Sequence, residues 1–248
     1  MLIEACVDSV ESAIAAEKGG ARRVELCTAL LEGGLTPSAG AVALARRQLT
    51  IALHPIVRPR GGDFLYSDSE HEVMLADIEH FKSVGADGVV IGILDAKGDV
   101  DVSRTRALID GARPMAVTFH RAFDMTRDPF TALEALVELG VERILTSGQE
   151  ESAMAGLDRL RELVTRAADR VTIMPAGNIH EANVSKIAQA TGATELHVTG
   201  FKNVDSEMSF RNPRVYMGGL LRPPEYVRAV TDADAIDKLV RLSGATHD

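Results

Sequence analysis

The chain has 248 residues, of which 46% are hydrophobic and 25% are charged, with a formal net charge of −9 and a pI near 5.3. A chain of this length and composition can bury a full-sized core, either as two small domains or as one large barrel. The acidic balance argues against a nucleic-acid partner or an anionic membrane surface, because no basic stripe is available.

Two further features bear on location. No apolar run approaches the roughly 18 residues that a membrane span needs, and the N-terminus shows no secretory pattern. The chain has 2 cysteines, too few for a disulfide framework at this length. We therefore expect no membrane partner and a cytoplasmic location with reduced thiols.

A weak internal repeat organises the chain. A glycine, a short turn and an apolar segment recur at residues 20–26, 85–91, 140–146 and 192–198. Glycine suits the residue after a helix because it tolerates positive φ, so each copy predicts a helix end followed by a strand. Four more apolar segments predict strands between these copies, at Leu2–Val7 and at residues 51–57, 115–120 and 171–174.

The helices predicted between these strands begin with recognisable caps. Some match a capping box, and others place a capping residue before a proline at the first helical position. The capping boxes are Asp8 with Glu11 and Ser67 with Glu70, and the proline pairs are Thr36-Pro37 and Asp128-Pro129.

Strands that alternate with helices in one chain without a linker predict a single TIM (β/α)8 barrel, over residues 1–200. The alternative is a doubly wound open sheet. Its glycine-rich turn after the first strand is missing, because residues 6–9 read Cys-Val-Asp-Ser. Residues 201–248 are predicted to be an irregular C-terminal extension of the same domain, ending in a helix over 232–242.

Chemistry in such a barrel occurs at the carboxyl ends of the strands. Many polar and thiol side chains are predicted at these strand ends, and packing alone does not require so many. They are Glu4, Cys6, Glu25, Cys27, His54, Arg58, Thr118, His120, Thr146, Ser147, Asn178, His197 and Thr199.

The two cysteines give the most specific chemical signal. Cys6 and Cys27 each follow a glutamate by two residues, at the ends of what are predicted to be neighbouring strands. Side chains two apart share a face, so the thiols would lie side by side, with Glu4 and Glu25 one layer deeper. Thiols in this arrangement can share a soft ion such as Cu(I).

Two other interpretations of the cysteines stay open. A free cysteine is often a small buried hydrophobe, and a disulfide is allowed at this separation. The nearby carboxylates would disfavour thiolates, so we expect sluggish thiols in the metal-free protein.

The loop at residues 58–64 is a candidate anion site. Arg58 and Arg60 can grip an oxyanion, and the glycine pair between Arg60 and Asp63 lets the backbone approach a ligand. The alternative is a structural turn in which Asp63 pairs with an arginine.

Candidate acid–base groups lie at the second and the fifth predicted strands. His120, at the end of the fifth strand, can act as a general acid or base, and Asp124 can orient it. Glu25, in the second strand, can also act as a general acid or base. The alternative is a hydrogen-bonded histidine beside a helix-cap aspartate.

The turns at residues 175–178, which include Asn178, and at residues 199–200 are candidates for phosphate binding. The alternative is that their small residues merely fit tight loops.

Several segments resemble the CutC copper homeostasis family, and the match covers essentially the whole chain. They are residues 4–9 (EACVDS), 24–27 (VELC), 32–38 (EGGLTPS), 58–64 (RPRGGDF), 117–124 (VTFHRAFD) and 145–149 (LTSGQ). The resemblance implies a single TIM barrel, a cytoplasmic homo-oligomer and a role in copper handling. It places Cys6 and Cys27 where the family's proposed Cu(I) ligands stand.

The chain also departs from the family pattern. Many bacterial members carry a cysteine where this chain has Leu65, so a site of three thiols is not available. Ala176 stands in a turn that is commonly a glycine run, which weakens the case for phosphate binding. The segment from Phe201 to Tyr226 is more similar to the animal form.

Three functional hypotheses follow. The first is a copper homeostasis protein that binds Cu(I) through Cys6 and Cys27. The second is a TIM-barrel enzyme acting on a small anionic or phosphorylated substrate, held by Arg58, Arg60 and Asn178. The third is a scaffold that works through its oligomer surface.

Overall fold

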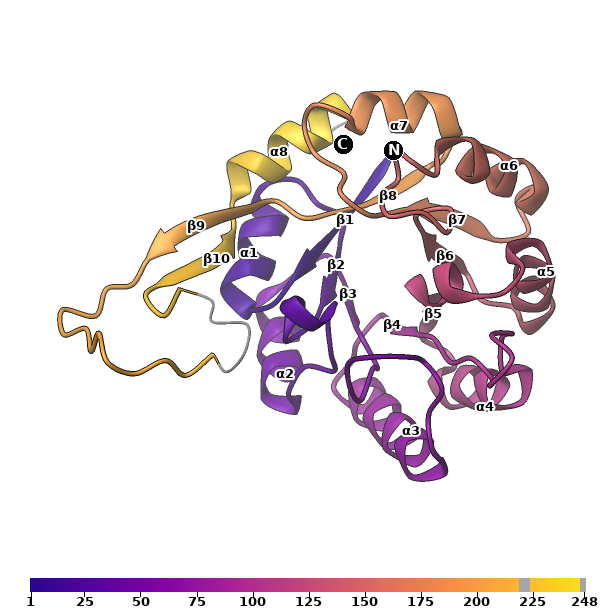
Figure 1. Ribbon diagram of the computed structural model, residues 1–248, viewed down its shortest axis with the longest axis horizontal. Helices are drawn as coiled ribbons and strands as arrows, with labels where there is room; N and C mark the ends of the chain where they lie inside the picture. The colour runs from indigo at the N-terminus through magenta and orange to yellow at the C-terminus, as the bar shows by residue number, and fades with distance from the viewer. Residues whose placement is uncertain (219–223, 246–248) are drawn as a thin grey trace.

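A computed structural model describes residues 1–218 and 224–245. Parallel strands alternate with helices along the chain, as the sequence predicts (Figure 1). The barrel elements are β1 (Leu2–Val7), α1 (Val10–Lys18), β2 (Arg23–Leu26), α2 (Ala39–Gln48), β3 (Ala52–Pro55), α3 (Asp68–Ser83), β4 (Gly88–Ile91), α4 (Val102–Ala112), β5 (Ala116–Phe119), α5 (Pro129–Leu139), β6 (Arg143–Thr146), α6 (Leu157–Ala167), β7 (Thr172–Pro175), α7 (Val184–Thr191) and β8 (Glu195–Val198). Short 3-10 helices follow β2 and β5, at Leu30–Glu32 and Arg121–Met125.

The strands form two parallel sheets of four, in the orders β3-β2-β1-β8 and β4-β5-β6-β7. Strand β1 pairs with both β2 and β8, so the first and last barrel strands are neighbours. A parallel bridge between Ile56 and Val90 joins the two sheets beyond the end of β3. The strands follow one another around a ring with α1 to α7 outside it (Figure 1), which is a TIM-like α/β fold and not a doubly wound open sheet.

Some helix caps match the prediction and others are shifted. Ser67 and Glu70 form the predicted capping box, and the Asp128 side chain accepts a hydrogen bond from the Thr131 N–H at 2.7 Å. The caps of α1 and α2 lie one or two residues later than predicted, at Ser9 in place of Asp8 and at Ser38 in place of Thr36. Serine caps well because its short hydroxyl reaches an N–H of the first turn.

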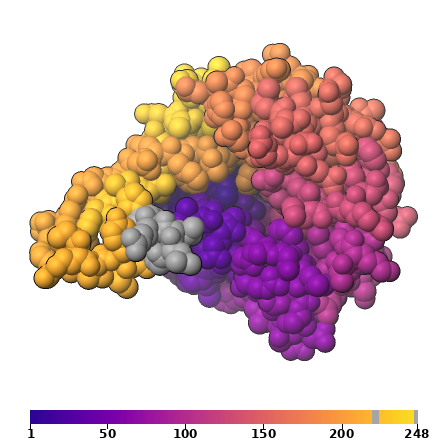
Figure 2. Space-filling model, viewed as in Figure 1, coloured from indigo at the N-terminus to yellow at the C-terminus, as the bar shows by residue number. Residues whose placement is uncertain are grey.

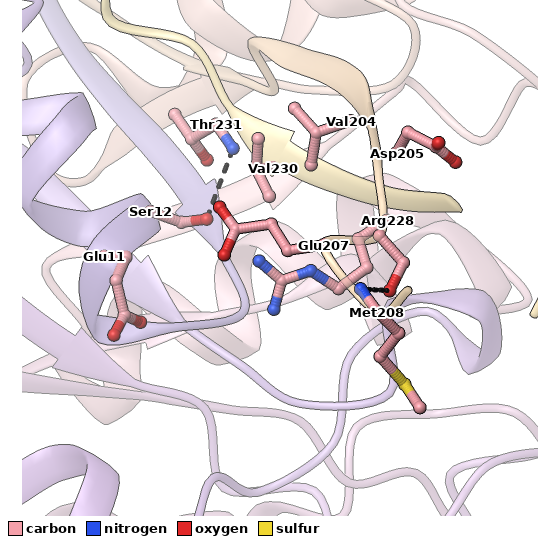
Figure 3. A pocket seen from close by; sticks show the side chains of 10 residues that line it. Glu11, Ser12, Val204, Asp205, Glu207, Met208, Arg228, Val230 and Thr231 are labelled. Carbon is pink, nitrogen blue, oxygen red and sulfur yellow. Dashed lines mark hydrogen bonds between the residues drawn. The ribbon is translucent and has the colours of Figure 1, made fainter. Parts of the chain in front are cut away.

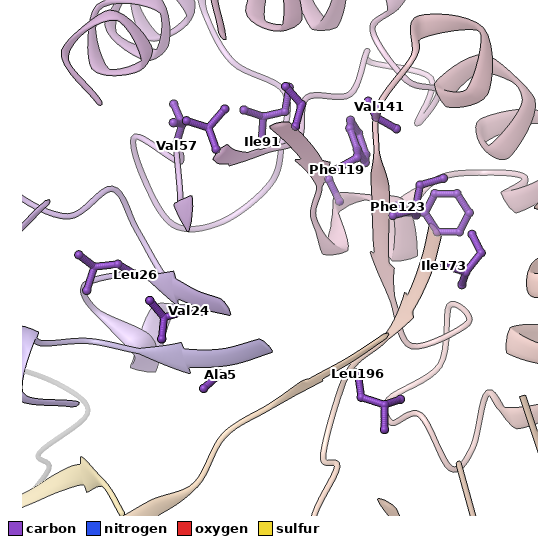
Figure 4. Close-up of a cluster of buried hydrophobic side chains, with 14 of the residues drawn as sticks. Ala5, Val24, Leu26, Val57, Ile91, Phe119, Phe123, Val141, Ile173 and Leu196 are labelled. Carbon is purple, nitrogen blue, oxygen red and sulfur yellow. The ribbon is translucent and has the colours of Figure 1, made fainter. Parts of the chain in front are cut away.

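The hydrophobic core lies between the strands and the surrounding helices. Alternate strand residues, such as Ala5, Val24 and Ile173, contribute to it (Figure 4), and Met74 and Ile78 of α3 belong to the same cluster. The remaining strand residues face the interior of the ring, where many are polar. No helix within the described residues is long and apolar enough to cross a bilayer.

The C-terminal extension is more regular than predicted. Strands β9 (Phe201–Asp205) and β10 (Val227–Thr231) pair antiparallel and form the base of an arm, residues 201–218 and 224–231, which projects from the barrel (Figures 1 and 2). The predicted terminal helix is confirmed as α8 (Ala233–Leu242). Residues 219–223 and 246–248, which include Arg222 and Pro223 of the predicted irregular stretch, lie outside the described part.

Candidate functional site

The two thiols lie together where β1 and β2 end. Cys6 Sγ and Cys27 Sγ are 3.9 Å apart, both cysteines are free, and their side chains are buried. The Cys27 N–H donates to the Val7 carbonyl at 2.8 Å, which fixes the backbone of one thiol against the strand of the other. The adjacency that the sequence predicts is therefore present.

A carboxyl group completes this cluster. Cys6, Glu25 and Cys27 each offer a ligand atom, and these atoms lie within 4.8 Å of one another. The strand register pairs Cys6 with Glu25 and Glu4 with Arg23. The expectation that Glu25 lies one layer below the thiols is wrong, because neighbouring strands of a barrel are staggered along its axis.

The two thiols differ in protonation. A hydrogen bond from the Cys27 thiol lowers the pKa of Cys6 to about 5 despite burial, and His197 acts in the same direction. The pKa of Cys27 is raised well above its usual range, because its proton is held in the bond to Cys6 and because it is buried. Burial and the Cys6 thiolate also raise the pKa of Glu25. The lowered pKa of Cys6 is opposite to the expected disfavouring of both thiolates, and the reactivity of the two thiols stays a prediction.

His197 links the thiols to the barrel interior. Its Nδ1 lies 2.7 Å from Glu4 Oε1, and its Nε2 lies 3.7 Å from Glu25 Oε2. Burial opposes protonation, but hydrogen bonds to Cys6 and Glu4 outweigh it and raise the pKa of His197 well above its usual range. The sequence places His197 at the rim but gives no signal that it bridges the two glutamates.

An ion-pair network lies below the thiols. Arg23 pairs with both Glu4 and Glu195, and Arg143 Nε lies 2.9 Å from Glu195 Oε2. Burial opposes the charge on Glu4, yet Arg23 and His197 hold the pKa of its carboxyl well below its usual range. TIM barrels usually fill this space with branched aliphatic side chains, so the charged interior is a distinctive feature of this chain.

His120 is fixed in one orientation on the other side of the ring. Its Nδ1 accepts a hydrogen bond from the Ala122 N–H at 3.1 Å, and its ring lies 5.0 Å from the ring of Phe64. A Cβ added at Gly92 would lie 2.3 Å from Nδ1, so only glycine leaves room for the imidazole. Burial and the Arg58 guanidinium lower the pKa of His120 to about 3. The ring is therefore neutral.

The thiol cluster and His120 border one cavity of about 220 Å³. Cys6, Glu25 and His197 line it, together with Arg58 and His120. Arg121, which the sequence analysis did not single out, also lines it; Asp124 and Ser147 hold its guanidinium at 2.7 and 2.8 Å. The structure thus brings the metal candidates and two of the acid–base candidates to one place.

The predicted anion-binding arginines have structural contacts. Arg58 donates to the carbonyls of Glu32, Gly34 and Gly62 at 2.7 to 3.1 Å, and so ties two loops together. Arg60 donates to Glu70 at 2.7 Å and to Asp63 at 3.0 Å, which is the arginine–aspartate turn considered as the alternative. Arg58 lines the cavity, whereas Arg60 is not among its lining residues.

Two other candidates lie apart from the cavity. Asp124 accepts from Thr146 Oγ1 at 2.5 Å and from the Ser147 N–H at 3.1 Å, and so organises the loop after β6. The hydrogen bond that orients His120 comes from Ala122 and not from Asp124. Asn178 is exposed after β7 and is not among the residues that line the cavity.

Together, the fold and the site define a class of protein, a TIM-like α/β barrel with two adjacent thiols and a carboxyl group where its first strands end. The sequence pattern of the CutC family matches residues 1–202. This chain belongs to the CutC family.

Relatives from animals and bacteria match nearly the whole chain. The copper homeostasis protein cutC homologs of Mus musculus and Homo sapiens are each 49% identical over 238 residues, which is 96% of this chain and 88% and 87% of theirs. The family protein CutC of Mesorhizobium japonicum is 48% identical over 244 residues, covering 98% of this chain and 95% of that protein.

Solved structures agree on the fold. The CutC protein from Streptococcus agalactiae superposes with a TM-score of 0.76 at 32% identity, covering 79% of this chain and 97% of that one. Phosphoribosylanthranilate isomerase from Thermotoga maritima has a TM-score of 0.58 at 12% identity, over 98% of each chain, which shows a shared fold alone.

Proposed function

We propose that this protein binds one Cu(I) ion through Cys6 and Cys27 and acts in copper homeostasis. The observation that carries the proposal is the 3.9 Å between the two Sγ atoms. A metal–thiolate bond is about 2.3 Å long, so one ion can contact both sulfurs without moving the strands. Thiolates select soft ions such as Cu(I).

The environment of the thiols supports the same proposal. The lowered pKa of Cys6, about 5, supplies a thiolate at neutral pH without a metal. Glu25 offers a carboxyl oxygen beside both sulfurs as a third contact. Burial and the Cys6 thiolate raise its pKa, which favours the neutral carboxyl and so disfavours a second negative charge beside the thiolate.

The test is an anaerobic Cu(I) titration of the reduced protein against a competing chelator. We expect one ion per chain, and loss of tight binding in Cys6→Ser and in Cys27→Ser. Ser147→Ala, which changes a hydroxyl outside the thiol cluster, is the control and should keep the wild-type affinity. Tight binding that persists when both cysteines are replaced would rule the proposal out.

We further propose that the protein works in the cytoplasm. The support is that both cysteines are free although their sulfurs are in contact. Thiols so close stay reduced in a reducing compartment. Fractionation of cells that express the protein should find it in the cytoplasmic fraction. Thiol alkylation before lysis prevents later oxidation, and alkylation of the denatured protein should then show both cysteines as reduced thiols.

We also propose that the protein is a homo-oligomer, assembled through the arm. The arm carries a concentration of exposed apolar side chains, and such patches mark protein interfaces. They are Phe201, Met208, Phe210, Val215, Tyr216, Met217 and Val227. At its base the arm borders a cavity of about 570 Å³ (Figure 3), where the Thr231 N–H donates to Ser12 Oγ at 3.2 Å.

The oligomer proposal has a matched test. Phe210 on the arm and Leu31 beside the barrel mouth are both 74% exposed, so replacing either with serine removes a similar apolar surface. Light scattering after size-exclusion chromatography should show that Phe210→Ser weakens the oligomer and that Leu31→Ser does not. A wild-type chain that is monomeric at all accessible concentrations would contradict the proposal.

A further inference from the structure

His120, one of the residues that line the cavity at the barrel mouth, has a buried ring nitrogen without a hydrogen-bond partner in the described part of the chain. His120 is 4% exposed, and its Nδ1 accepts from the Ala122 N–H. A neutral imidazole carries one proton, which we therefore assign to Nε2. Within the described residues, Nε2 has no hydrogen-bond partner. Leaving a buried donor unpaired is unfavourable, so an acceptor brought in from outside would be stabilised here.

The charges around His120 favour an anion. Two guanidinium groups, those of Arg58 and Arg121, border the cavity. Loop carbonyls hold Arg58, and Asp124 and Ser147 hold Arg121, so both charges stay in place without a ligand. The other ionisable side chains of the lining are Glu32, which is exposed, and Cys6, Glu25 and His197, which contact one another at the thiol cluster.

The size and the apolar part of the wall favour a small organic molecule. A volume of about 220 Å³ corresponds to about seven waters at ~30 Å³ each. Ile56, Phe64 and Leu145 form an apolar part of the wall, which suits a short carbon skeleton better than a bare inorganic anion.

We propose that this cavity is a binding site for a small carboxylate, one oxygen of which accepts a hydrogen bond from His120 Nε2–H while Arg58 and Arg121 balance its charge. The ring is held for this role by the Ala122 N–H, by Phe64 and by the space at Gly92. The proposal does not depend on copper, because His120, Arg58 and Arg121 are not candidate metal ligands, although Cys6 and Glu25 border the same cavity.

The test measures binding to reduced, copper-free wild-type protein by calorimetry. The probes are acetate and pyruvate, with the neutral amide of pyruvate and inorganic phosphate as comparators. We expect saturable binding of pyruvate, weaker binding of acetate, and binding of the amide and of phosphate at least tenfold weaker than that of pyruvate. Absence of saturable binding by either carboxylate, or tighter binding of phosphate, would overturn the proposal.

A matched pair of variants isolates the donor. His120→Asn keeps an acceptor for the Ala122 N–H, since asparagine is a favoured capping residue, but removes the N–H at Nε2. His180 makes the same local contact, its Nδ1 accepting from the Ala182 N–H at 3.3 Å, on an exposed loop outside the cavity. We expect His120→Asn to weaken pyruvate binding about tenfold to a hundredfold, and His180→Asn to leave it unchanged.

A second measurement covers the case in which His120→Asn does not fold. In the nitrogen-15 spectrum of the wild-type protein, the Nε2–H signal of His120 should shift when pyruvate is added and stay in place when the amide is added. The proposal would be contradicted if the wild type and His120→Asn bound pyruvate with equal affinity, or if the Nε2–H signal did not shift when pyruvate is added. Neither result would affect the copper titration, in which both cysteines are the variables.

Discussion

Cys6 and Cys27 lie 21 positions apart in the chain, yet their Sγ atoms are 3.9 Å apart in the fold. The contact makes the two thiols unequal, because one proton shared between two sulfurs stabilises a thiolate on Cys6 and keeps Cys27 protonated. Such a pair titrates as a unit, so changes to one thiol should appear in the other.

The first prediction concerns this coupling. Cys27→Ser keeps a hydroxyl that can donate to Cys6, so Cys6 should retain a lowered pKa near the value of about 5. Cys27→Ala removes the donor and should raise the pKa of Cys6 toward that of an ordinary thiol. Each variant has one thiol, so the ultraviolet absorbance of the thiolate against pH reports Cys6 alone. Coinciding titration curves for the two variants would contradict the assigned hydrogen bond.

The second prediction concerns the space at Gly92. A Cβ at this position would lie 2.2 Å from His120 Cε1, so Gly92→Ala should destabilise the protein by about 1–3 kcal/mol through overpacking. Adding His120→Ala should recover part of that loss. Gly40→Ala is the control, since nothing lies within 4 Å of its added Cβ. Urea unfolding measures all three, and a double variant no more stable than Gly92→Ala would refute the steric cause.

The third prediction concerns acid. Unfolded histidines take up protons near pH 6.5, whereas burial lowers the pKa of His54 to about 4 and of His120 to about 3. Between those pH values each of these two histidines binds more protons in the unfolded chain than in the folded one, so its contribution to the free energy of unfolding falls as the pH falls. Each histidine contributes up to about 1.4 kcal/mol per pH unit.

His120→Asn should reduce this dependence of the free energy of unfolding on pH by up to the contribution of one bound proton. Urea unfolding at several pH values between 4.5 and 6.5 provides the measurement. His197 and Glu4 do not obscure it. The raised pKa of His197 contributes stability that is lost only above pH 6.5, and the lowered pKa of Glu4 contributes stability that is lost only below about 4.5. An unchanged slope in His120→Asn would show that His120 is not neutral in the folded protein.

The fourth prediction concerns the buried ion pairs. Arg23→Met leaves Glu4 buried without its main counter-charge, and such losses typically cost about 3–5 kcal/mol. Arg161→Met breaks an exposed pair with Asp158 and should cost less than about 1 kcal/mol. If denaturant unfolding gave the two variants similar losses, the interior network would not be the stabilising element that its burial suggests.

The fold could be predicted closely because each strand is an apolar run bounded by a glycine turn. The predicted strands all recur within a residue or two, and the adjacency of Cys6 and Cys27 follows from the sequential pairing of β1 and β2. The level of Glu25 beside Cys6 could not be predicted, because the stagger between strands depends on closure of the whole ring and not on either segment.

The chemistry of the rim was less accessible from sequence. Arg58 and Arg60 were candidates to hold an anion, with an arginine–aspartate turn as the alternative. Arg58 donates to carbonyls of a loop more than 20 residues away, which no local pattern indicates, and Arg60 forms the turn with Asp63. The arm was missed because the segments of β9 and β10 are largely exposed, so hydrophobic alternation is weak. The sequence placed His197 at the rim but gave no signal of its contacts, since Glu4 and Glu25 come from other strands.

Glycines stand at the start of β4 and directly after its end, at Gly88 and Gly92. Cβ atoms added at Gly88 and Gly92 would collide with the imidazoles of His54 and His120, which enter from the strands on either side. The size of the residue at these two places therefore reports whether a related sequence can house the same histidines. A relative with a larger residue at position 92 would be expected to have lost the imidazole at position 120 or moved it into the opening.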